Sequence, residues 1–128
     1  VFRKTRRNNI YLQLISNDLN IKVPVEKSCF EEIVSPRFSI LVKPNKIKDV
    51  LNLASKRRIE IGRWFDKCPP SKNIFDIDYC DFEITSLICL NIINFPCYWT
   101  LSKEELRRIK DLIIELYAKD LLQTNKNF

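Results

Sequence analysis

The chain contains no histidine, no methionine and only one glycine among its 128 residues. Without histidine it cannot by itself form a Ser-His-Asp or Cys-His catalytic set, or a histidine-containing zinc site. With Gly62 as its only glycine it cannot form the glycine-rich loops that bind dinucleotides or triphosphates. The absence of methionine, with Val1 as the first residue, favours an internal or C-terminal piece of a longer protein.

Long apolar runs are also missing. No stretch approaches the roughly 18 apolar residues of a membrane span, and the basic, amphipathic segment that begins at Arg3 lacks the apolar core of a signal peptide. We therefore expect a cytoplasmic protein without membrane contact. A composition of 45% hydrophobic and 30% charged residues fits one globular domain of modest size.

Cysteine spacing excludes the common cysteine motifs. No two of the five cysteines are spaced as C-x-x-C, which excludes zinc-ribbon and thioredoxin-like sites. We expect reduced thiols, with Cys89 as a small core residue because it lies in an apolar run. A metal site assembled from distant cysteines, or from Asp76, Asp78 and Asp81, remains a weaker alternative, since the glycine and terminal glutamate of an EF-hand are missing. The sequence predicts no metal.

The chain is basic, with 22 lysines and arginines against 16 acidic residues and a formal net charge of +6. Such a balance is compatible with nucleic acid or an acidic membrane as partner, but also with the lysine-, asparagine- and isoleucine-rich composition of an AT-rich genome. Only residues 3–7 and 56–58 form basic clusters, and no aromatic residues alternate with them. Nucleic-acid binding is therefore not expected.

Three segments have the pattern of amphipathic helices, at residues 5–19, 46–57 and 102–119. The first helix is predicted from the helical spacing of its apolar residues, Ile10, Tyr11, Leu14 and Ile15. The second is predicted to begin after an Asn45 N-cap and to bury Ile47, Val50, Leu51 and Ala54. In the third, Ser102 and Glu105 form a capping box. Its predicted buried residues are Leu106, Ile109, Leu112, Ile113 and Leu116. The end beyond Leu122 is predicted to fray.

Two segments have strand character, at residues 37–43 and 59–65. Gly62 lies inside the second, and a lone glycine in a strand indicates either a packing need or a close approach of another group. The apolar segment 85–93 fits a helix or a strand, and we favour a helix. The remaining segments, 21–36, 66–82 and 94–101, are predicted as irregular.

This element order predicts an α/β fold of the α+β two-layer type, with a small sheet of two or three strands covered by helices. We expect a single domain over residues 1–128. It would comprise a linking helix over 1–20, an α/β core over 35–119 and a tail over 120–128.

Three motifs in order resemble the C-terminal small domain of the DegT/DnrJ/StrS family of pyridoxal-phosphate-dependent sugar aminotransferases. Residues 36–42, Pro-Arg-Phe-Ser-Ile-Leu-Val, precede a helix that ends in Ala-Ser-Lys-Arg-Arg at 54–58. Residues 59–65, Ile-Glu-Ile-Gly-Arg-Trp-Phe, follow. Asn-Phe-Pro at 94–96 then precedes the final helix. The similarity covers roughly residues 35–115 and is carried by the order and spacing of the motifs.

The resemblance implies the small domain of an aspartate-aminotransferase fold, in an enzyme that transfers an amino group from an amino acid to a keto sugar on a nucleotide. It implies pyridoxal phosphate as cofactor, a large N-terminal domain that holds the Schiff-base lysine, and a homodimer. The products would serve polysaccharide or surface-glycan synthesis. It assigns no catalytic residue to this chain, and we expect no cofactor on this part alone.

The same resemblance implies a substrate-binding role for Arg63, Trp64 and Pro70 at the active-site cleft. Arg63 would pair with a carboxylate or phosphate, and Trp64 would stack on a sugar or base. Instead of binding substrate, Arg63 could be a solvated strand residue, and the same alternative applies to Arg37. Trp64 could instead pack in the core. The family's histidines are replaced, one of them by Tyr98, so a non-catalytic basic binding or scaffold module is the second interpretation.

Overall fold

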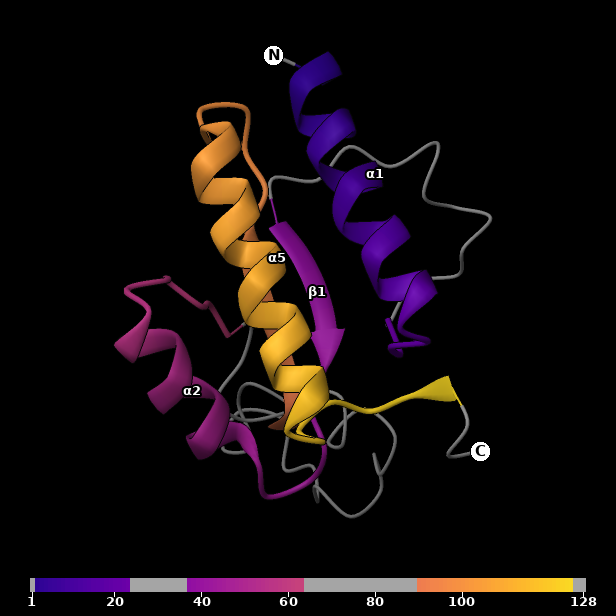
Figure 1. Cartoon of the computed structure of the whole chain (residues 1–128), viewed down its shortest axis with the longest axis vertical. Helices are drawn as coiled ribbons and strands as arrows, with labels where there is room; N and C mark the ends of the chain where they lie inside the picture. The colour runs from indigo at the N-terminus through magenta and orange to yellow at the C-terminus, as the bar shows by residue number, and fades with distance from the viewer. Residues whose placement is uncertain (1, 24–36, 64–89, 126–128) are drawn as a thin grey trace, which may run out of the picture.

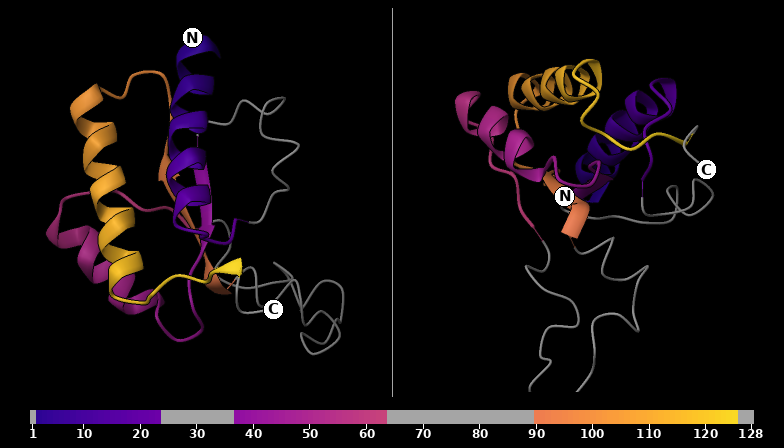
Figure 2. Two further views of the ribbon diagram at one scale, coloured as in Figure 1. Left: turned by 45° about the vertical axis from the view of Figure 1, so that its right-hand side comes forward. Right: turned by 90° about the horizontal axis from the view of Figure 1, so that it is seen from below.

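The computed structural model describes residues 2–23, 37–63 and 90–125. Within them the chain forms a small α+β domain, and its element order is α1 (Phe2–Asp18), β1 (Arg37–Leu41), α2 (Ile47–Lys56), β2 (Ile92–Pro96) and α5 (Lys103–Ala118). The three helices lie over one face of a two-stranded sheet, with α5 between α2 and α1 (Figures 1 and 2). No described helix is both long and apolar enough to cross a lipid bilayer.

The sheet pairs β1 with β2 in antiparallel orientation, and Arg37 lies opposite Pro96 at one end. Phe38 and Ile40 of β1 point into the core together with Ile93 and Phe95 of β2. This alternation follows from the two-residue period of a strand and confirms the strand predicted from residue 37. The helices therefore cover the apolar face of the sheet.

Strand β2 corrects two predictions, because we expected a helix up to residue 93 and a loop from Asn94. Leu90 and Asn91 are helical, the strand begins at Ile92, and residues 85–89 lie outside the described ranges. All five strand residues are buried, so no alternation of polar and apolar residues reveals the strand. Pro96 is tolerated because it is the last residue, where a missing N–H interrupts no ladder.

The predicted strand over 59–65 is seen only as one bridge. Gly62 pairs with Asn94, and each backbone N–H donates to the other residue's carbonyl oxygen at 2.9 Å. Residues 64 and 65 lie outside the described ranges. β2 is thus flanked by β1 on one side and by Gly62 on the other.

Helices α2 and α5 form where the apolar spacing predicts them. On α5 the Ser102 hydroxyl oxygen accepts a hydrogen bond from the Glu105 N–H at 3.0 Å, which is the predicted N-cap. Four of the five residues predicted to be buried on α5 are buried, and Leu106 is half-buried. On α2 the predicted cap is wrong: Lys46 is the N-cap, and Asn45 lies in the turn before it at φ 67°, a left-handed conformation that asparagine tolerates.

The buried side of α1 also differs from the prediction. Ile10 and Leu14 are 38% and 57% exposed, whereas the side against the core carries Leu12 together with polar residues. The buried polar residues of this helix are Thr5, Asn8, Asn9, Gln13 and Ser16. The Asn9 amide donates to the Thr5 carbonyl at 2.9 Å, and the Gln13 amide donates to the Asn17 side-chain oxygen at 2.8 Å, so these two amides are satisfied within the helix.

The segment after α5 is part of the fold up to Asn125, so the predicted fraying beyond Leu122 is wrong there. Leu121 and Leu122 are buried, and Leu122 forms a bridge with Val42. The Gln123 N–H donates to the Leu41 carbonyl at 2.9 Å, and its own carbonyl accepts from Lys22 at 2.8 Å. This segment therefore connects the end of β1 with the chain after α1.

Candidate functional site

The sheet has a second face, directed away from the apolar core, and it carries polar groups. Ser39 and Asn94 are cross-strand neighbours in the β1–β2 register. The Ser39 hydroxyl donates to the Asn94 side-chain oxygen, and Asn94 is fully buried. A buried amide in the middle of an apolar strand is costly unless it is hydrogen-bonded, so this pair fixes the register of the polar face.

Arg37 and Gly62 meet at the edge of this face. A Cβ atom on residue 62 would lie 2.8 Å from Arg37 Nη1 and 3.8 Å from Asn94 Cβ. The single glycine thus allows a guanidinium to lie against the backbone, which is one of the two alternatives that the sequence leaves open for Gly62. Arg37 is exposed to solvent, and its guanidinium lies against Gly62.

Arg63 follows directly and lies at the wall of a hollow of about 510 Å³. Its Nη2 donates to the Leu90 carbonyl oxygen at 2.9 Å. The opposite wall is the turn and first residues of α2, at Pro44, Asn45, Ile47 and Lys48. These segments meet because the Val42 N–H donates to the Asn91 carbonyl at 2.8 Å, which joins the end of β1 to the start of β2.

We call this hollow the Arg63 hollow. The charged side chains of its described lining are positive. Among the described residues that line the hollow, Arg63 and Lys48 are cationic and none is acidic. The N-terminus of α2 also borders it; Lys46 provides no side-chain cap there, and the first turn carries Asp49 outside the lining. Backbone N–H groups at a helix N-terminus favour anions. A carboxylate or phosphate therefore fits the hollow electrostatically, with the guanidinium held in position by Leu90.

Of the three predicted substrate-binding residues, only Arg63 lies within the described ranges. Trp64 and Pro70 lie outside them, so their predicted roles stay predictions. Sequence reasoning missed Lys48, Ser39 and Asn94. The only available signal was an asparagine within the otherwise apolar run Ile-Ile-Asn-Phe-Pro at 92–96.

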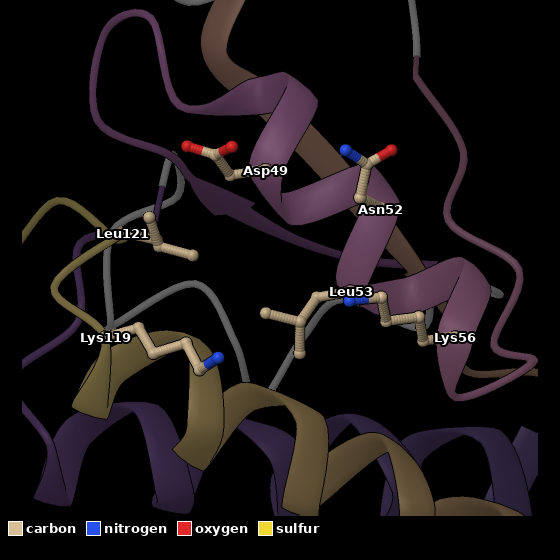
Figure 3. Close-up of a pocket in the computed structure, with 6 residues that line it drawn as sticks. All are labelled: Asp49, Asn52, Leu53, Lys56, Lys119 and Leu121. Carbon is tan, nitrogen blue, oxygen red and sulfur yellow. The ribbon is translucent and has the colours of Figure 1, made fainter.

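A second hollow, of about 350 Å³, separates α2 from the end of α5 (Figure 3). Leu53 points into it from α2, and Lys119 extends along its opposite side. Its lining combines Asp49 with Lys56 and Lys119, and Lys119 also forms an ion pair with Glu115 at 3.8 Å. Because its charges are mixed, this hollow favours neither sign of ligand.

The described residues contain no group of three or more cysteine, aspartate or glutamate side chains placed to hold a metal. Cys97 is buried at the end of β2 as a free thiol. Burial raises its pKa from 9.0 to about 12, so the thiol stays protonated and unreactive at neutral pH. The predicted core cysteine, Cys89, lies outside the described ranges.

Comparison with known proteins finds no matching family model and no matching curated sequence.

Proposed function

We propose that this chain is the C-terminal small domain of a pyridoxal-phosphate-dependent nucleotide-sugar aminotransferase, which works in the cytoplasm as a homodimer together with a large N-terminal domain. One observation carries the proposal. The described parts of the three motifs are adjacent, because β2, with Asn94 and Pro96, pairs with β1 in the two-stranded sheet, and Asn94 also forms an isolated bridge with Gly62. Segments spaced widely in the sequence thus combine into one unit.

The Arg63 hollow supports the substrate part of the proposal. A nucleotide-linked sugar carries a diphosphate, and the described part of the lining offers Arg63 and Lys48 and no acidic residue. Guanidinium groups bind phosphate and carboxylate oxygens in a fixed planar geometry. Arg63 would hold the anionic group, and Lys48 would add charge from the opposite wall. Transfer of an amino group would take place on the large domain.

The cofactor itself does not fit the described residues. Pyridoxal phosphate supplies the electron sink for amino transfer and is held through a lysine that must lose its proton to react. Every described lysine is exposed or half-buried, so none lies in the enclosed site that a covalently held cofactor requires. We assign none of them to the cofactor, and this chain's part is to bind substrate and cover the cleft.

The hollow is tested by titrating the ¹⁵N-labelled chain with uridine diphosphate at millimolar concentration and following the amide resonances. We expect shifts at residues 45–48 and 63 that saturate. Arg63→Gln should remove them, and Arg6→Gln, an exposed arginine of α1, should leave them unchanged. Saturation without a response to Arg63→Gln would refute the assignment of Arg63.

A non-catalytic scaffold or binding module is the second candidate. Tyr98 and Trp99 stand where the family carries histidine and proline, and they are 39% and 48% exposed after β2. Exposed aromatic side chains are typical of interaction surfaces. This candidate would be favoured if the chain binds uridine diphosphate at the Arg63 hollow but the protein that also contains the large domain shows no amino-transfer activity.

A further inference from the structure

A groove between α1 and α5 lies apart from the Arg63 hollow. The two helices contact each other, run in the same direction and have their N-terminal ends together (Figure 1). The groove has a volume of about 390 Å³. Its lining comes from positions 4, 7, 8 and 11 of α1 and 103, 106, 107 and 110 of α5, the i, i+3, i+4, i+7 spacing of one helix side.

The rim of this α1–α5 groove is cationic. It consists of Lys4, Arg7, Lys103, Arg107 and Lys110, and none of the described residues of the lining is acidic. Glu104 binds Arg107 from outside the lining, at 2.6 Å and 3.1 Å, and offsets one of the charges. The other four cations, Lys4, Arg7, Lys103 and Lys110, form a positively charged cluster.

The N-terminus of α1 adds to this positive potential, whereas the first turn of α5 already carries Glu104 and Glu105. The first turn of α1 contains no acidic residue, although basic residues beside a helix N-terminus oppose the helix dipole. Such an arrangement costs helix stability in the free chain. Carboxylates of a bound partner would relieve this cost.

The floor and the far end of the groove are apolar. Tyr11, Leu101 and Leu106 form the floor beneath the cations. Toward the helix C-termini, Leu14 follows Tyr11 by three residues, and Ile114 and Tyr117 follow Lys110 by four and seven residues. They are 57%, 42% and 40% exposed, respectively. The groove side of the two helices is thus basic at one end and apolar at the other.

We propose that the α1–α5 groove binds an amphipathic helix of a partner protein that carries carboxylates toward its C-terminal end and apolar side chains toward its N-terminal end. The bound helix runs antiparallel to α1 and α5, because its negative dipole end and its carboxylates then meet the basic end of the groove. Its apolar side chains cover Leu14, Ile114 and Tyr117. Nucleic acid fits less well, because phosphates have no counterpart on the apolar floor and the basic half offers one aromatic ring, Tyr11.

A synthetic peptide provides the probe. From Lys103 to Tyr117 the groove side extends over 15 residues, a rise of roughly 21 Å along the helix, so a helical peptide of about 15 residues spans it. The peptide carries leucines on one side and glutamates in its last two turns, with a fluorescent label. Its binding to the full 128-residue chain is followed by fluorescence anisotropy.

Two neighbouring arginines give a matched pair of variants. Arg7 lines the groove. Arg6 is also exposed, but it lies on another side of α1 and outside the lining. We expect Arg7→Glu to weaken peptide binding about tenfold, and Arg6→Glu to change it less than about twofold. Leu14→Ser should weaken binding as well. Lys110→Glu serves as a second groove variant if circular dichroism shows that Arg7→Glu does not fold.

Three outcomes would overturn the proposal. Equal losses with Arg6→Glu and Arg7→Glu would mean a diffuse charge effect. Equal affinity for a peptide whose glutamates occupy the first two turns would contradict the antiparallel orientation. Displacement of the peptide by a single-stranded DNA oligonucleotide, with an affinity that exceeds the peptide's, would assign the groove to nucleic acid instead.

Discussion

Arg37 closes over Gly62, with its Nη1 atom 2.8 Å from the position that a Cβ on residue 62 would occupy. The contact joins the first residue of β1 to the segment that pairs with β2 on the other side. Because the obstructing atom is the end of a flexible side chain, a methyl group at residue 62 displaces the guanidinium and leaves the backbone in place.

Gly62→Ala should therefore cost little stability, less than about 1 kcal/mol in urea denaturation, while it moves Arg37. In an Arg37→Ala background the same change should be neutral or stabilising, because alanine restricts the unfolded chain. The double-mutant cycle measures this coupling. Equal effects of Gly62→Ala in both backgrounds would show that Arg37 does not rest on Gly62.

The Ser39–Asn94 pair is expected to stabilise the sheet from its polar face. Ser39→Ala removes the donor to the buried Asn94 oxygen, which should lower the free energy of unfolding by about 1–3 kcal/mol. Ser55→Ala, an exposed serine in α2, is the matched control and should change it by less than about 0.5 kcal/mol. Chemical denaturation of both variants decides the point.

An element of this fold was predictable where it has a periodic or capping pattern in the sequence. Helix α5 was found because its cap and its apolar spacing agree. Strand β2 was not, since a fully buried segment has no period to read. The buried side of α1 was misassigned because tertiary packing places Leu12 and several amides inside and leaves Leu14 outside.

The candidate site was predictable only in part for a related reason. Arg63 was found through a motif, but Lys48 lies on another element, and only the folded chain brings the two to one hollow. No local pattern in the sequence marks such a pairing. The C-terminal strand-like segment escaped prediction likewise, because its partners, Ile21 and Val42, are distant in the sequence.

The segment after α5 should contribute substantially to stability. A chain that ends at Asp120 loses the buried Leu121 and Leu122 and the hydrogen bonds of Gln123 with Leu41 and Lys22. We expect it to be less stable by about 3 kcal/mol or more. A chain that ends at Asn125 keeps these contacts and is the control. Thermal unfolding at equal concentration compares the two, and equal midpoints would contradict the role assigned to this segment.

Cys97 gives a pH-dependent prediction. Its pKa rises from 9.0 to about 12 on burial, so the unfolded chain loses this proton first as the pH increases. Below pH 9 the group leaves stability unchanged, and between about pH 9 and 12 its contribution to the free energy of unfolding falls. Cys97→Ala should flatten this part of the pH profile. In the folded chain at pH 8, peptide mapping should find Cys97 unmodified by iodoacetamide, and modification at the rate of a free thiol would contradict its burial.

The proposed function is tested most directly on the protein encoded by the reading frame extended upstream of Val1. We predict a large domain there, bound pyridoxal phosphate visible in the absorbance spectrum, and a spectral change on addition of glutamate that a nucleotide-linked keto sugar reverses. Arg63→Gln should weaken the reversal and spare the glutamate step. A reading frame that stops immediately upstream, or an extended protein that binds no pyridoxal phosphate, would contradict the aminotransferase assignment and favour the scaffold.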